Sequence, residues 1–185
     1  MNRHLFTVLL FALLVAGCAS SLPYASDYPL TDEVFRSRDG VLAGKVPKGW
    51  FSSTDESVAP ALLAWIVKED FSATLALSAI ALDAESDRQV GKDGLALLAR
   101  ISFALQRGIS STASMTAEPR EFDLSGKKFC GYEITDGGTR KRIVVFGARG
   151  KYYECIAMSS HPGPGADEAT RMFNAQQTLL ASLSF

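Results

Sequence analysis

The pattern of apolar and polar positions predicts strands in the first half of the chain. Short apolar segments at 34–36 and 41–46 are separated by an Asp-Gly pair, which is typical of a hairpin turn. Residues 61–67 form an apolar run, and residues 74–82 alternate with a period of two, as expected for a strand. The charged cluster at 68–70 lies in the turn at 68–71 between the last two segments, so we expect them to pair antiparallel.

Apolar residues spaced by three and four positions predict two helices. The first is expected over 88–106, capped at its start by Ser86 or Asp87 and ended near Gly108. The second is expected over 167–182, close to the end of the chain. Its predicted buried stripe consists of Met172, Phe173, Leu179, Leu180 and Leu183.

The second half of the chain also predicts a strand meander. Segment 115–124 contains Pro119, which suits an edge strand because proline has no N–H to donate. Segments 127–135, 140–146 and 151–159 follow, joined by short glycine-rich turns. We therefore expect the middle one of these three strands to lie between the other two.

Cys130 and Cys155 fall on the outer strands of that meander. Next-nearest strands are about 10 Å apart, whereas a disulfide needs Cα atoms within about 7 Å. We therefore expect two buried free thiols. A disulfide is the alternative that an oxidising compartment would favour.

The start of the chain has the pattern of a secretory signal peptide. Arg3 precedes an apolar run over 5–16 that is shorter than the roughly 20 residues needed to span a bilayer. The residues that follow resemble the lipobox of bacterial lipoproteins; they are Val15, Ala16, Gly17 and Cys18. The resemblance implies cleavage before Cys18 and acylation of Cys18, palmitate included, which would hold the protein on a membrane. An ordinary secretory signal with an incidental cysteine is the alternative.

These features divide the chain into a signal peptide at 1–17, a lipidated cysteine with a flexible tether at 18–32, and one globular domain at 33–185. The tether is rich in Ser and Pro and has no apolar period. The residue after Cys18 is Ala19 rather than Asp. By resemblance to enterobacterial lipoproteins, this implies an outer-membrane location facing the periplasm.

Composition and motifs argue against catalysis. The formal net charge of −1 provides no field that would attract nucleic acid. His161 is the one histidine outside the predicted signal peptide, and no nucleophile elbow, phosphate loop or metal-spaced Cys/His set occurs. The acidic segment 83–87 lacks the later Gly and Glu of a calcium loop. We expect no catalytic residues, no metal and no cofactor, and hence not an enzyme.

A few residues stand out as possible contacts for a ligand or partner. Trp50 follows a turn and could be either a core residue or a ligand contact, and Trp65 lies in the next apolar run. Basic residues flank the predicted meander turn, and they could form a patch for anionic lipid or an acidic partner: Lys127, Lys128, Arg140, Lys141 and Arg142. Charged residues that keep sheet edges from aggregating are the alternative explanation.

The order of elements resembles the PsbP-like fold, which DcrB-like bacterial lipoproteins share. The resemblance rests on Val46-Pro47-Lys48-Gly49-Trp50, on the strands over 126–158 and on the ending Leu183-Ser184-Phe185. It implies an α+β fold in which helices flank an antiparallel sheet, an α-β-α sandwich, and mostly non-enzymatic members. We therefore expect a lipid-anchored envelope protein that binds a protein partner or supports assembly of a complex. The alternative is a binder of a small apolar ligand or lipid in a pocket beside the sheet.

Overall fold

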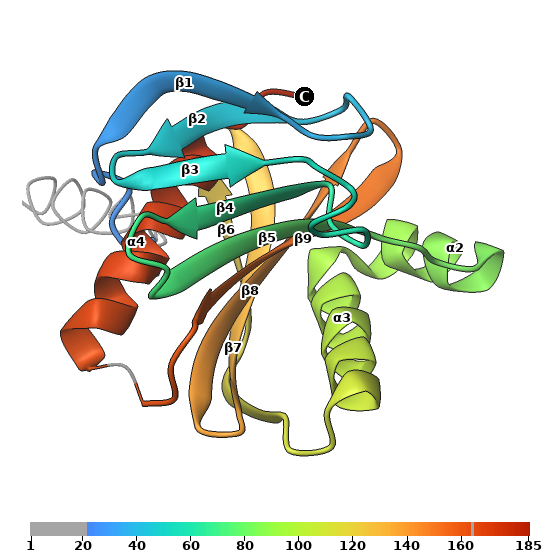
Figure 1. Ribbon diagram of the computed structural model, residues 1–185. Helices are drawn as coiled ribbons and strands as arrows, with labels where there is room; N and C mark the ends of the chain where they lie inside the picture. Colours follow the sequence, from blue (N-terminus) through green and yellow to red (C-terminus); the bar gives the residue numbers. More distant parts are fainter. Residues whose placement is uncertain (1–21, 164) are drawn as a thin grey trace, which may run out of the picture.

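An antiparallel sheet of seven strands organises the computed structural model, which describes residues 22–163 and 165–185 (Figure 1). The strand order is β3-β4-β5-β9-β8-β7-β6. The strands are β3 (Trp50–Ser53), β4 (Ala64–Lys68), β5 (Ala73–Ile80), β6 (Ser114–Leu124), β7 (Lys127–Asp136), β8 (Thr139–Ala148) and β9 (Lys151–Ser159). The predicted pair β4–β5 and the predicted meander β7–β8–β9 are confirmed, and β6 with Pro119 is an edge strand as expected.

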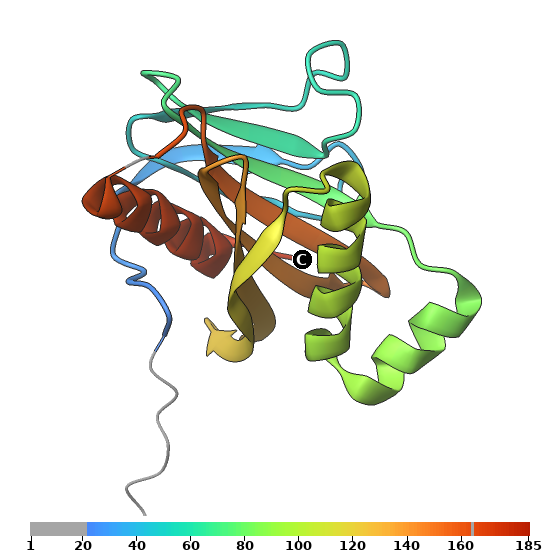
Figure 2. The same cartoon turned by 90° about the horizontal axis from the view of Figure 1, so that it is seen from below.

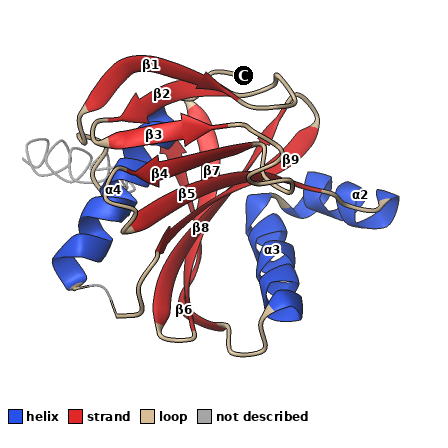
Figure 3. Cartoon of the chain, viewed as in Figure 1, coloured by secondary structure: helices blue, strands red, loops and turns tan. Residues whose placement is uncertain are grey.

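Helices lie on both faces of this sheet (Figures 1 and 2). Helix α4 (Ala166–Ser182) packs on one face together with the hairpin of β1 (Leu30–Arg36) and β2 (Ala43–Pro47). Helices α2 (Ala84–Asp93) and α3 (Leu95–Ile109) are on the other face, where α3 packs against β6, β7 and β8. Two apolar cores result, one under α4 and one under α3. The predicted α-β-α arrangement is confirmed, as Figure 3 also shows by element type.

The single helix expected over 88–106 is instead two helices that meet at Gly94. Gly94 has a φ of +80°, a value that glycine adopts readily and that interrupts the helix. The first helix begins earlier than predicted because Asp83, not Ser86 or Asp87, caps it through bonds from the Glu85 and Ser86 N–H groups. The second helix continues past Gly108 to Ile109.

The described part of the expected tether is not free. Residues 22–29, called the strap below, lie against α4. The N–H of Ala25 donates to Asn174 Oδ1 at 3.1 Å, and the N–H of Tyr28 donates to Thr178 Oγ1 at 3.0 Å. Strand β1 then begins at Leu30, inside the predicted tether. The tether prediction was therefore wrong from residue 22 onward, because aromatic side chains that looked isolated in sequence pack on α4.

The predicted lipobox, from Val15 to Cys18, lies outside the described residues, so signal cleavage and lipidation stay predictions. In the part of the chain that the structure describes, no helix is both long and apolar enough to cross a membrane.

Cys130 and Cys155 point to opposite faces of the sheet. Cys130 belongs to the core under α3 and Cys155 to the core under α4, with β8 between their strands. Both are free and buried. Burial raises the pKa of each thiol to about 12, which leaves almost no reactive thiolate at neutral pH.

We expect both thiols to be present but unreactive in the folded protein. In the Cys18→Ala variant, which leaves only Cys130 and Cys155, a colorimetric thiol reagent should find almost no reactive sulfur under native conditions. It should find both thiols after unfolding without reductant. Absence of thiols in the unfolded sample would show a disulfide and contradict the strand placement.

A half-buried carboxylate connects α3 to the sheet. Glu154 on β9 accepts hydrogen bonds from Ser102 at 2.6 Å and from Ser78 at 3.2 Å, and Ser102 also bonds to the Tyr132 hydroxyl at 2.8 Å. Desolvation by burial raises the pKa of Glu154 above its ordinary value. The folded chain therefore holds this proton more tightly than the unfolded chain does.

This difference in pKa predicts that the stability of the fold depends on pH, and the Glu154→Gln variant should lack this dependence. Stability from this site is greatest below the ordinary pKa of 4.5 and falls as pH rises through the higher folded-state pKa, because ionisation is then more costly in the folded chain. The variant should gain stability relative to wild type between acidic and mildly alkaline pH. Urea unfolding of both proteins at several pH values measures this; a constant difference would exclude Glu154 as the titrating group.

Candidate binding site

A pocket of about 460 Å³ lies between the first turns of α4 and strands β3–β5. Its volume is within the range typical of ligand pockets. Trp50, Ala73, Ala169 and Met172 contribute apolar surface, and Tyr28 of the strap closes one side. The pocket is thus built from the sheet, a helix and the strap together.

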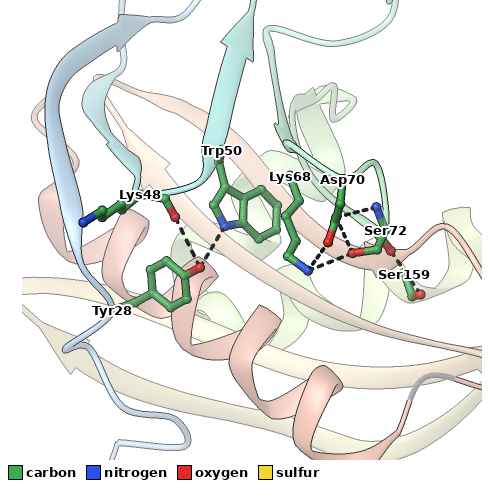
Figure 4. Close-up of polar contacts among 7 residues, drawn as sticks. All are labelled: Tyr28, Lys48, Trp50, Lys68, Asp70, Ser72 and Ser159. Atoms are coloured by element: carbon green, nitrogen blue, oxygen red, sulfur yellow. Dashed lines mark hydrogen bonds and ion pairs between the residues drawn. The ribbon is translucent and has the colours of Figure 1, made fainter.

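The turn before β3 positions the indole of Trp50. Gly49 has a φ of +80°, which lets the chain reverse after Lys48 and turns the following residue toward the α4 face. The indole is 4% exposed, and its Nε1–H donates to the Tyr28 hydroxyl at 3.3 Å (Figure 4). The Tyr28 hydroxyl in turn donates to the Lys48 carbonyl at 3.3 Å.

Lys68, the last residue of β4, contributes a cation to the pocket wall. Its Nζ donates to Asp70 Oδ2 at 2.8 Å and to Ser72 Oγ at 2.9 Å (Figure 4). The hydrogen bond from Lys68 holds the pKa of Asp70 well below its usual range. Lys68 Nζ lies 2.9 Å from Ser72 Oγ, the spacing of a base and a nucleophile, but Lys68 also forms an ion pair with Asp70 at 2.8 Å.

The opposite rim carries charges of both signs from the first turns of α4. Asp167, Glu168 and Arg171 line it. Among the described residues no group of three or more His, Cys, Asp or Glu side chains is placed to hold a metal ion. The pocket therefore suits a ligand with an apolar end, which would enter the pocket, and a polar part, which would remain at the charged rim.

The two tryptophans singled out in sequence lie on opposite faces of the sheet. Trp50 pairs with Lys68, and Ser53 pairs with Trp65. Paired residues share a face and successive residues alternate, so Trp65 points away from the α4 face. The structure therefore places Trp50 in the pocket and Trp65, half-buried, outside it. Sequence spacing missed Tyr28, which was assigned to the tether.

The predicted basic patch does not form. Lys127 and Lys128 lie at the β6–β7 turn, whereas Arg140 pairs with Thr135 near the other end of β7. Eight residues of strand, about 26 Å, separate the two ends. The prediction was wrong because it assigned both groups of basic residues to one turn, whereas they lie near the two ends of β7.

Several of these charges are paired with carboxylates, and Arg142 is buried. Arg140 donates to Glu133 Oε2 at 2.6 Å, and Lys141 donates to Asp136 Oδ2 at 2.7 Å from the opposite face. Lys128 pairs with Asp123 at 3.3 Å. Arg142 is 1% exposed and lies under α4, so it cannot form part of a surface patch in this state.

Burial of Arg142 is the feature that sequence reasoning missed. Its guanidinium donates to Gln176 Oε1 at 2.9 Å and to Gln177 Oε1 at 2.6 Å, both on α4. Desolvation lowers its pKa to about 10, so it still carries a proton at neutral pH. A signal was available: Arg142 shares the inward period-two face of β8 with Val144 and Phe146.

Comparison with solved structures identifies a protein with a similar fold. The solution structure of cyanobacterial PsbP (CyanoP) from Synechocystis sp. PCC 6803 matches with a TM-score of 0.54 at 13% identity, over 91% of this chain and 99% of that chain. The chain has the PsbP-like fold. At this identity the likeness shows the fold alone.

Other comparisons add little to this result. A crystal structure from Bacteroides thetaiotaomicron VPI-5482 matches with a TM-score of 0.40 at 13% identity, over 85% of this chain and 48% of that chain, which is too weak to support an argument. No protein-family model matches the chain, and no curated protein matches it.

The different environments of the tryptophans predict different costs of truncation. Trp50→Ala should lower the free energy of unfolding by about 3–5 kcal/mol, because it empties a buried site under α4. Trp65→Ala, the matched control on the other face, should cost clearly less, since its side chain is half-buried. Urea unfolding measures both, and equal losses would contradict the assignment of Trp50 to the pocket wall.

Proposed function

We propose that this chain is a non-catalytic binding protein of the cell envelope, held at a membrane by lipid on Cys18, whose domain binds a protein partner. The pocket beside α4 is the observation that supports this proposal. It joins an apolar floor at Trp50 and Met172 to a rim with Lys68, Arg171 and Asp167. Partner surfaces gain most affinity where an apolar or aromatic anchor enters such a pocket, while rim charges set orientation and association rate.

The chemistry of the pocket supports binding rather than catalysis. Lys68, the candidate base for Ser72, is ion-paired with Asp70. The PsbP-like fold is compatible with a binding role, and fold likeness does not by itself assign an activity.

A small amphipathic molecule or lipid is the second candidate occupant. The volume of about 460 Å³ would hold one, and its mixture of aromatic and charged walls would suit an apolar body with a polar head. This candidate needs no protein partner, so an experiment that detects a protein partner at the pocket distinguishes the two candidate occupants.

Site-specific photocrosslinking in cells tests the proposal. A photoreactive residue replaces the exposed Arg171 at the pocket rim of the full-length protein, and the same residue replaces the exposed Arg107 on α3 as a matched control on the other face. We expect one discrete protein adduct from position 171 and none from position 107. The adduct should weaken in Cys18→Ala, because the lipid concentrates the domain at the membrane.

Three outcomes separate the candidates. Equal adducts from positions 171 and 107 would contradict docking at the pocket. No protein adduct, together with a bound small molecule in native mass spectra of the purified protein, would favour the second candidate. Neither an adduct nor a bound molecule would contradict a binding role for the pocket.

A further inference from the structure

Arg142 is a buried cation whose nearest bonds are to neutral groups. Among the described residues its guanidinium donates to the side-chain oxygens of Gln176 and Gln177. Glu133 lies directly across from it on β7, but that carboxylate accepts from Arg140 and from the Tyr24 hydroxyl instead. A buried charge usually has a bonded counter-charge, because desolvation is otherwise expensive.

Gln177 adds a second donor without an acceptor. Its Nε2 is buried and has no hydrogen-bond partner among the described residues. Its Oε1 accepts from Arg142 at 2.6 Å, so the amide cannot flip without turning its N–H groups toward a group that only donates. Guanidinium N–H groups and an amide N–H are thus close together with acceptors in short supply.

A hollow of about 170 Å³ lies beside Arg142, and neither Gln176 nor Gln177 lines it. Arg142, Tyr24 and Glu133 line it, together with Gly131. A Cβ at Gly131 would lie 3.3 Å from the Phe122 ring and 3.6 Å from Nη2 of Arg142, so the glycine lets both side chains approach the β7 backbone closely. The hollow is smaller than a typical ligand pocket and would hold a single small group.

The strap covers this site through Tyr24. The centroid of the Tyr24 ring lies 4.7 Å from the guanidinium carbon of Arg142 and 5.1 Å from the ring centroid of Phe173. No strand pairing holds residues 22–29. One backbone N–H each from Ala25 and Tyr28 donates to an α4 side chain, and the Pro29 carbonyl accepts from the Lys48 N–H at 2.8 Å. A segment held by few backbone bonds can open locally at a low free-energy cost.

We propose that the hollow beside Arg142 is a carboxylate-binding site that the Tyr24 strap covers. A carboxylate is planar, accepts two parallel N–H bonds from a guanidinium and carries the single charge that would balance Arg142. The wall carries charges of both signs, because Arg120 lines the hollow together with Glu118 and Glu133. The carboxylate could belong to a small organic acid or to the end of a peptide chain. The site is separate from the pocket at α4's first turns, so it stands or falls independently of the proposed function.

The test follows the side-chain N–H signals of Arg142 and Gln177 by nuclear magnetic resonance in the full-length protein in detergent. The probes are propionate and the peptide acetyl-Gly-Gly-Ala with a free carboxylate; its C-terminal amide and sodium chloride at equal ionic strength are controls. We expect saturable shifts with at least one carboxylate and none with the controls. Propionate alone would identify small acids, and a tighter peptide would identify chain ends.

Variants of Tyr24, which covers the site, and of Gln177, which contacts Arg142, make this test more specific. Tyr24→Ala should bind the active probe roughly tenfold more tightly, because the probe no longer has to displace the ring. Gln177→Glu supplies an internal carboxylate beside Arg142 and should abolish the response. The matched control Asn174→Asp adds the same charge to α4, keeps an acceptor for the Ala25 N–H and should respond as wild type does.

Several results would overturn the proposal. One is the absence of a carboxylate-dependent shift in both wild type and Tyr24→Ala. Others are equal shifts with chloride, or an unchanged response in Gln177→Glu.

Discussion

The desolvated guanidinium of Arg142 is the constraint on which the packing of α4 depends. A buried arginine needs acceptors, and α4 supplies them from two consecutive glutamines. Gln176 also donates to the carbonyls of Arg142 and Cys155, so one side chain ties the helix to both β8 and β9. Sliding α4 along the sheet would break these bonds and leave the charge without acceptors. The helix position, and with it the walls of the pocket at its first turns, is therefore set by polar groups as well as by apolar burial.

The strap links the two sites along one side of α4. Tyr24 lies over Arg142, and Tyr28 lies beside Trp50 in the larger pocket. Displacement of this segment at one site would therefore alter the wall of the other.

Sequence patterns predicted the sheet well because strand formation here is largely a local matter. Period-two alternation and glycine turns placed β7, β8 and β9, and the proline in β6 correctly indicated an edge. The helix prediction failed at Gly94, where a positive φ divides one apolar pattern into two helices. The basic-patch prediction was wrong for a different reason: nearness in sequence was taken for nearness in space, although Lys127 begins β7 and Arg140, on β8, lies beside the other end of β7.

By itself the sequence determined the α+β class, the strand meander, the C-terminal helix and the buried cysteines, because each follows from residues a few positions apart. Only the tertiary structure decided which face each side chain occupies and which distant groups meet. It placed Trp50 against Tyr28, moved Trp65 to the other face and buried Arg142 between β8 and α4. A charged residue in a strand reads as exposed until its acceptors are known. Here those acceptors lie more than thirty residues away, on a helix whose place depends on the whole sheet.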